Sequence, residues 1–226
     1  MSKITKVVAR QVFDSRGNPT IEAEVFSNNV SSSSICPSGA STGSFEAYEK
    51  RDKNKKYYNG KSVFTAIKII NTVISKKLKN QNVHNQEKID YILLKLDGTK
   101  QKKKLGANSM LVVSMAVKKL SSKLKKIPLY KNFFVKKNFL LPYPLMNIIN
   151  GGVHANNGLQ IQEFIIRPDG AKSFTQAVKM CFLVINNLKK LLTNLNLSTS
   201  VRDEGGFAPM ISSNSHALQL ISKAIK

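Results

Sequence analysis

Arginine and acidic residues are scarce in this chain of 226 residues. Lysine and arginine together number 36 against 13 aspartates and glutamates, which gives a formal net charge of +23, yet only five of these bases are arginines. Direct base readout and bidentate phosphate clamping favour arginine, so the shortage argues against a dedicated nucleic-acid-binding protein. We interpret the lysines as a solvated basic surface set by composition, which binds nucleic acid only non-specifically.

Cysteines and long apolar runs are also few. Cys36 and Cys181 are the only cysteines, and they form neither a disulfide framework nor a metal-finger spacing. No apolar run approaches the ~18 residues of a membrane-spanning helix, and the N-terminus lacks the features of a signal peptide. Because 42% of the residues are hydrophobic, a disordered polycation is excluded too. The expectation is a soluble, cytoplasmic, globular protein without a membrane partner.

The first part of the chain predicts strands followed by helices. Residues 20–26 alternate between apolar side chains and glutamates, the pattern of a half-buried antiparallel strand, and residues 4–9 and 30–35 predict further strands. Apolar side chains at helical spacing then predict three helices, over residues 63–78, 89–96 and 107–124, with Ser62 and Asn108 as candidate starts.

Prolines at positions 128, 142 and 144 break this pattern, and we place a domain boundary near residue 138. Beyond it, residues 145–149 and 161–166 predict strands that are apolar enough to be largely buried. Residues 173–194 predict an amphipathic helix behind Ser173, with Phe174, Val178 and Cys181 among its core-facing side chains. Ser215 is expected to cap a last helix.

The few acidic residues of the second part lie in distinctive contexts. Glu163 falls within an apolar strand, and Asp203 and Glu204 precede two glycines. A carboxylate in an apolar strand is costly unless it is paired, protonated or bound to a metal. Carboxylates at strand ends before glycine loops are common in barrel active sites. The alternative is that Glu163 faces solvent and that Asp203 and Glu204 form a turn.

Two glycine-rich segments, residues 38–43 and 150–158, are candidates to wrap a ligand, because glycines permit the tight or mobile backbone that lids require. Neither is a phosphate-binding loop, since no Gly-Lys-Ser/Thr follows the glycines. His154, inside the second segment, is a better functional candidate than His84 or His216, which are expected at the surface. A loop histidine without a role is the alternative.

Together these segments resemble the enolase (phosphopyruvate hydratase) family. The motifs that carry the resemblance occur in the family's order and spacing, at residues 13–22 (FDSRGNPTIE), 37–43 (PSGASTG), 96–99 (LDGT), 105–109 (LGANS), 146–152 (MNIINGG), 162–164 (QEF) and 203–206 (DEGG).

The resemblance implies a fold and a reaction. The fold is an α+β N-terminal domain over residues 1–138, with a three-stranded antiparallel sheet plus helices, followed over residues 139–226 by the first part of an incomplete α/β (TIM-like) barrel. The reaction is the reversible dehydration of 2-phosphoglycerate to phosphoenolpyruvate in glycolysis. A lysine base removes the C2 proton and two Mg²⁺ ions stabilise the enediolate. The family also implies a homodimer.

By the same resemblance, Glu204 is the acid that protonates the departing C3 hydroxyl, and Glu163 is its partner in the pocket. Gln162 contacts the substrate. His154 belongs to a mobile loop that closes over the phosphate end, and Ser41 completes the second Mg²⁺ site when its own loop shuts. Arg202 stands where the family usually has glycine, and its side chain either crowds the pocket or points to solvent.

The resemblance covers all of this chain but only about the first half of an enolase, so a truncated chain that is inactive alone is expected. The carboxylate ligands of the first Mg²⁺, the lysine base and later substrate contacts have no counterpart, because no acidic residue follows Glu204. Two interpretations stay open. One is an enolase that needs a complementing C-terminal half, and the other is a non-catalytic fragment or repurposed lysine-rich binding protein.

Overall fold

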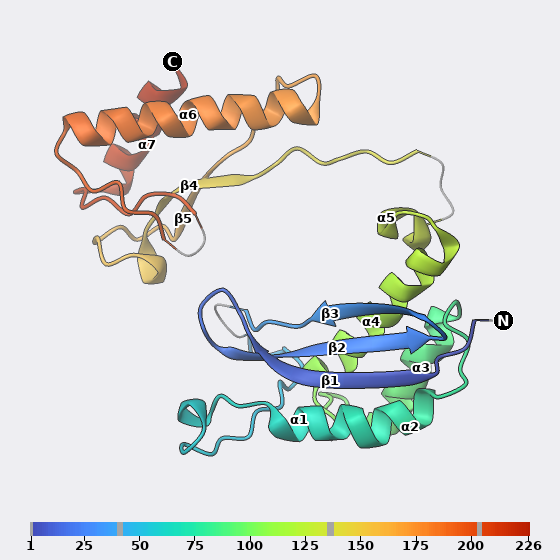
Figure 1. The fold of residues 1–226 in the computed structure, drawn as a ribbon. Helices are drawn as coiled ribbons and strands as arrows, with labels where there is room; N and C mark the ends of the chain where they lie inside the picture. The colour runs from blue at the N-terminus through green and yellow to red at the C-terminus, as the bar shows by residue number, and fades with distance from the viewer. Residues whose placement is uncertain (1, 40–42, 135–137, 203–204) are drawn as a thin grey trace. The chain divides into compact units, whose positions relative to one another are not determined.

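The chain divides into two compact units, Met1–Lys137 and Asn138–Lys226 (Figure 1). The structure is a computed structural model that describes residues 2–39, 43–134, 138–202 and 205–226. Each unit has its own cluster of buried apolar side chains, so each is described by itself.

Unit 1 begins with a three-stranded antiparallel sheet. Its strands lie side by side in chain order, β1 (Lys6–Phe13), β2 (Pro19–Ser27) and β3 (Val30–Ile35). Ile21, Ala23 and Val25 of the central strand are fully buried, as their alternation with the glutamates predicts.

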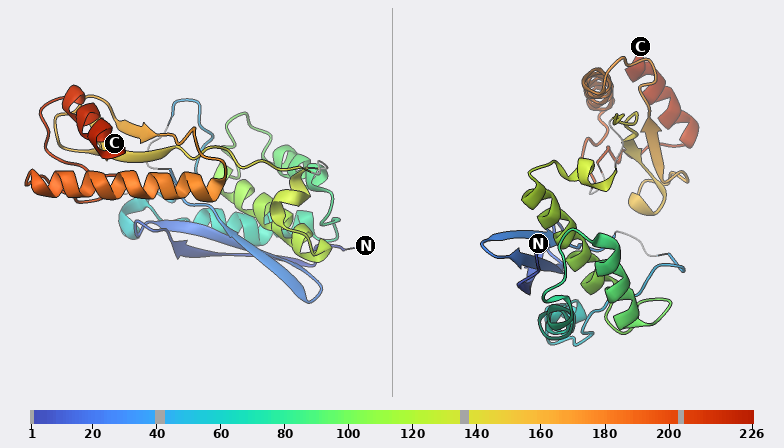
Figure 2. Two further views of the ribbon diagram at one scale, coloured as in Figure 1. Left: turned by 90° about the horizontal axis from the view of Figure 1, so that it is seen from above. Right: turned by 90° about the vertical axis from the view of Figure 1, so that its right-hand side faces the viewer.

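Helices cover this sheet (Figures 1 and 2). A nearly continuous helical run consists of α1 (Phe64–Ile69), the π-helical turn η2 (Ile70–Ile74) and α2 (Ser75–Leu78), and η2 packs against β1. Next come α3 (Gln86–Asp97) and α4 (Ala107–Lys125), and α4 packs against β2 and β3. The short elements of the unit are η1 (Tyr58–Gly60) and α5 (Leu129–Phe133).

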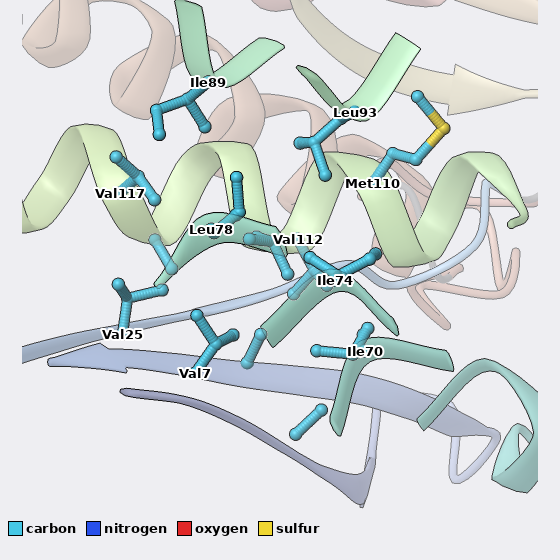
Figure 3. Close-up of a cluster of buried hydrophobic side chains, with 14 of the residues drawn as sticks. Val7, Val25, Ile70, Ile74, Leu78, Ile89, Leu93, Met110, Val112 and Val117 are labelled. Atoms are coloured by element: carbon cyan, nitrogen blue, oxygen red, sulfur yellow. The ribbon is translucent and has the colours of Figure 1, made fainter. Parts of the chain in front are cut away.

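The core of unit 1 lies between the helices and the sheet (Figure 3). Val25 from the sheet, Ile74 from η2, Leu93 from α3 and Val117 from α4 point toward one another there. This antiparallel sheet with helices is the α+β arrangement that the sequence predicts for the first part of the chain.

Two predicted helix starts are wrong in detail. The first backbone amides of α1 are capped by Asp52 rather than Ser62, since the Asp52 carboxylate accepts from the N–H groups of Phe64 (2.8 Å) and Thr65 (2.9 Å). Asn108 lies inside α4, where its side-chain amide bonds both backbone groups of Lys50 at 3.0 Å. In both cases the hydrogen bond joins residues that are distant in the chain, and hydrophobic periodicity does not reveal such partners.

Unit 2 contains two antiparallel strands and two long helices. The strands are β4 (Met146–Asn150) and β5 (Glu163–Ile166), and the helices α6 (Phe174–Asn194) and α7 (Asn214–Ile225) pack on each other. A short 3₁₀ turn, η3 (Gly152–His154), follows β4. The apolar core joins both strands to both helices.

Burial in unit 2 differs from the prediction. Phe164 of β5 is buried, but the next residue, Ile165, is 48% exposed. On α6, Phe174 and Val178 are likewise exposed rather than core-facing. The cap of α7 is Ser213, whose hydroxyl accepts from the His216 N–H, so the prediction of Ser215 is wrong.

The apolar stripe of α6 is otherwise where the sequence predicts it. Ser173 caps the helix by accepting from the Gln176 N–H (3.1 Å), and Cys181 is buried, which raises the pKa of its thiol. Cys181 is therefore a core residue, as expected, and not a nucleophile. Among the described residues, no helix is both long and apolar enough to cross a membrane.

Candidate active site

The candidate site of unit 2 is built at the carboxyl end of β4. Asn150, the last residue of β4, pairs with Glu163, the first residue of β5, and the next amide, that of Gly151, donates to the Gln162 carbonyl (2.9 Å). The side chain of Glu163 is half-buried and that of Gln162 is exposed. The structure thus brings both sequence-predicted residues to the end of β4.

The turn after β4 requires glycine. A Cβ atom at Gly151 would lie 2.3 Å from the Ile161 carbonyl oxygen and 2.6 Å from the Leu159 Cβ, closer than such atoms approach. The next residue, Gly152, has φ +53° and donates from its N–H to the Leu159 carbonyl (2.7 Å). The backbone of His154 ends η3, and its side chain lies outside the described residues.

A second segment reaches the same end of β4. The Phe207 N–H donates to the Ile148 carbonyl (2.9 Å) and the Phe207 carbonyl accepts from the Asn150 N–H (2.8 Å), which places residue 207 parallel to β4. Just before it, the Arg202 N–H donates to the Gly206 carbonyl (3.3 Å), and the Gly205 N–H donates to the Arg202 carbonyl (3.0 Å). These two bonds hold the backbone of Arg202 close to that of Gly205 and Gly206, the residues just before Phe207.

Asp203 and Glu204, the carboxylates that the DEGG motif singles out, lie outside the described residues, as does Ser41. The residues that flank the pair in the sequence, Arg202 and Gly205, are described. Arg202 is exposed, which agrees with the solvent-facing alternative for its side chain.

Sequence reasoning missed Asn150, which connects the two segments. Its fully buried side chain donates through Nδ2 to the Gly205 carbonyl (2.6 Å) and accepts through Oδ1 from Asn147 Nδ2 (2.7 Å). Because a buried amide without partners is costly, this arrangement fixes the Gly205 backbone relative to β4. The only signal in the sequence is an asparagine directly before the glycine pair.

Asn157 is the second missed residue. Its Nδ2 donates to the carbonyls of Asn150 (2.8 Å) and Pro209 (3.0 Å), while its Oδ1 accepts from the Leu159 N–H (3.3 Å). Asn157 is buried, so the segment 150–158 is tied to the core at this point.

The other glycine-rich segment lies in unit 1. Ser38, its first residue, is bonded by the side chains of Arg16 and Arg51, and at its far end the Gly43 N–H donates to Glu46 Oε1 (2.9 Å). Residues 40–42 between these anchors are not described.

Clusters of metal-binding side chains are absent from the described part of the chain. Within the described ranges, no group of three or more histidine, cysteine, aspartate or glutamate side chains could hold a metal ion. The described residues do not by themselves fit a complete Mg²⁺ site, and Ser41, the predicted ligand, is not among them.

Comparison with known proteins gives two matching families. Residues 4–133 match the family described as enolase, N-terminal domain, and residues 138–226 match the family described as enolase, C-terminal TIM barrel domain.

Curated relatives agree with these matches. The enolase of Pelagibacter ubique (strain HTCC1062) is 67% identical over 225 residues, which cover 100% of this chain and 54% of that protein. The enolase of Ehrlichia canis (strain Jake) is 49% identical over 229 residues, with the same two coverages. The enolase of Mycoplasma mobile (strain ATCC 43663 / 163K / NCTC 11711) is 49% identical over 230 residues, 100% of this chain and 50% of that protein. The chain spans about half the length of the curated relatives it matches.

Proposed function

This chain belongs to the enolase family, and we propose that it supplies the acid side of the enolase reaction, the reversible dehydration of 2-phosphoglycerate to phosphoenolpyruvate. The proposed compartment is the cytoplasm. We further propose that residues 1–138 are the family's N-terminal domain and residues 139–226 the start of its barrel.

One observation carries the proposal. The backbone of Asn150 pairs with Glu163 in the β4–β5 ladder, and its buried side chain donates to the Gly205 carbonyl at 2.6 Å, so one residue contacts two carboxylate-bearing segments at one strand end. In a barrel, this is the end where catalytic side chains collect. The position of Gly205, next in the chain to Glu204, supports a role for Glu204 beside Glu163.

The proposed roles follow from the chemistry of dehydration. Loss of the C3 hydroxyl requires a proton donor, and Glu204 is proposed to be that general acid, with Glu163 as its partner in the pocket. Gln162 is proposed to hydrogen-bond the substrate. His154, at the end of η3, is proposed to close over the phosphate end.

The remaining parts of the reaction are proposed to come from outside this chain. The family's Mg²⁺ would stabilise the enediolate charge, and this chain is proposed to contribute only Ser41 to that site. The base that removes the C2 proton is proposed to lie in a complementing C-terminal half. The family homodimer is also proposed for this protein, and sedimentation of the reconstituted protein would test it.

Reconstitution tests the proposal. The purified chain is mixed with the separately produced part of the Pelagibacter ubique enolase that this chain does not match, in the presence of Mg²⁺ and 2-phosphoglycerate. Phosphoenolpyruvate absorbance is expected only when both parts are present. A folded complement that binds the chain but yields no product would overturn the proposal.

A matched pair of variants controls this assay. Glu204→Gln removes the proposed acid, and Asp169→Asn removes a carboxylate that forms an exposed ion pair with Arg167 (2.6 Å). Each change costs one negative charge, so a general electrostatic effect would slow both mixtures alike. Loss of product with Glu204→Gln, at unchanged product with Asp169→Asn, is the expected result.

A further inference from the structure

Two of the chain's few arginines converge on Ser38. The Arg16 Nη2 donates to the backbone carbonyl of Ser38 (2.6 Å), and the Arg51 Nη2 donates to its hydroxyl (2.7 Å). Arg16 lies in the turn between β1 and β2, whereas Arg51 follows the glycine-rich segment. Two segments distant in the chain therefore hold the same loop residue.

The hydroxyl of Ser38 is held in a fixed orientation. It donates to Glu49 Oε1 (2.6 Å) while accepting from Arg51, and Glu49 Oε1 lies 2.9 Å from Arg51 Nη2. A serine hydroxyl has one proton to donate, and here this proton and one lone pair are engaged by charged partners. Such charge-assisted bonds are short and strong. The Arg51 side chain is only 18% exposed, so water competes weakly for it.

The other side of Arg51 is fixed to the sheet. Its Nη1 donates to the carbonyls of Pro19, the first residue of β2 (3.1 Å), and Lys61. The neighbouring Thr20 hydroxyl donates to the Cys36 carbonyl (2.6 Å), which extends the order of β3 toward Ser38. Lysine offers a single point charge, so it could not bridge these acceptors as the planar guanidinium does.

We propose that Arg51 is a positioning residue that, through Ser38 and Glu49, fixes the start of the loop that runs from Gly39 to Gly43. This inference rests on the proposed function, which assigns Ser41 of that loop to the active site. Only four residues, 39–42, separate Ser38 from Gly43, which is itself bonded to Glu46. The bonds to Ser38 therefore act on the described residue with which this loop begins, Gly39.

Glycine-selective ¹⁵N labelling of the full chain provides the test. The chain has 12 glycines, so the amides of Gly39 and Gly98 can be followed individually by relaxation. The variants are Arg51→Ala, Ser38→Ala and, as a control, Arg10→Ala, which removes an arginine that bonds Glu22 (2.5 Å) on the sheet. Gly98, at the end of α3, reports on the fold of unit 1.

The Gly39 order parameter is expected near the rigid value of ~0.85 in the wild type and below ~0.6 in Arg51→Ala and Ser38→Ala, with no change in Arg10→Ala or at Gly98. Added ethylguanidinium should restore Gly39 in Arg51→Ala but not in Ser38→Ala. A variant that only weakens the fold would not regain the wild-type Gly39 order parameter when ethylguanidinium is added.

An unchanged Gly39 in folded Arg51→Ala and Ser38→Ala would overturn the positioning role, and if Arg51→Ala fails to fold, Ser38→Ala alone decides. The measurement needs no catalysis. A failed reconstitution would therefore remove the proposed function while leaving the effect of Arg51 on the loop intact.

Discussion

At the scale of single residues, Asp97 shows why the LDGT motif has structural value. This buried carboxylate ends α3 and accepts through Oδ1 from the Thr99 N–H (3.0 Å) and hydroxyl, and through Oδ2 from the Leu105 N–H (2.7 Å). Burial raises the pKa of Asp97, but the hydrogen bonds outweigh burial and hold the pKa below its usual value. The fold therefore stabilises the ionised form of the Asp97 carboxyl group.

Replacing Asp97 by alanine is expected to lower the free energy of unfolding at neutral pH by about 2–3 kcal/mol, because hydrogen bonds to a charged group are lost. Since the folded pKa is depressed, the wild-type contribution is complete above the unfolded pKa of about 3.9 and is lost as pH falls through the folded pKa. Urea unfolding at several pH values measures both effects.

The control for Asp97 is Asp169→Ala, which removes an exposed carboxylate paired with Arg167. Exposed pairs contribute about 0–1 kcal/mol, so this variant should unfold near the wild-type midpoint. If both variants lost the same stability, or if Asp97→Ala kept the full wild-type dependence on acid, the structural role of Asp97 would be wrong.

At the scale of elements, the junction of β4 and β5 depends on close backbone approach. Gly151→Ala is expected to destabilise unit 2 by roughly 1–3 kcal/mol, because the new methyl group meets the Ile161 carbonyl oxygen. Gly170→Ala is the matched control, since nothing lies within 4 Å of a Cβ there and its φ is not positive. Thermal unfolding compares the two variants, and equal melting temperatures would contradict the close approach.

The sequence predicts a helix or strand correctly where the spacing of neighbouring apolar residues determines it. The alternation of Ile21, Ala23 and Val25 predicts the buried face of β2, and helical spacing around Cys181 predicts α6. The starts of α1 and α4 do not follow, because Asp52 caps α1 across the chain and Asn108 bonds Lys50 instead of capping α4.

In the candidate site, too, the local sequence predicts some features, whereas others depend on contacts between distant residues. A carboxylate in an apolar strand directs attention to Glu163 from chemistry alone. The role of Asn150 exists only once β4 lies beside the Gly205 backbone, a contact between residues 55 positions apart that no spacing rule predicts. Glu204, Ser41 and the His154 side chain lie outside the described residues, so their roles remain predictions.

At the scale of the whole molecule, unit 2 leaves large apolar side chains in water. Phe182 and Leu183 of α6 and Ile165 of β5 are exposed, and a cavity of about 390 Å³ lies between α6 and β4, lined in part by Cys181 and Gly206. Exposed apolar surface of this kind is typical of interfaces. It supports the proposal that a complementing half packs against unit 2.

The chain matches about half the length of its relatives, and its proposed contribution is equally partial. Glu204 and Glu163 would serve loss of the C3 hydroxyl, whereas removal of the C2 proton is proposed to use a base from the complementing half. The two steps can be measured separately, because exchange of the C2 proton with solvent reports proton removal and phosphoenolpyruvate reports loss of the hydroxyl.

The most direct test of this division is exchange of the C2 proton of 2-phosphoglycerate in D₂O, catalysed by the reconstituted protein. With Glu204→Gln in this chain, deuterium is expected to enter C2 while phosphoenolpyruvate formation falls by at least ~10²-fold, the usual contribution of a general acid. Phosphoenolpyruvate formed by Glu204→Gln at the wild-type rate would contradict the assignment of the acid side to this chain.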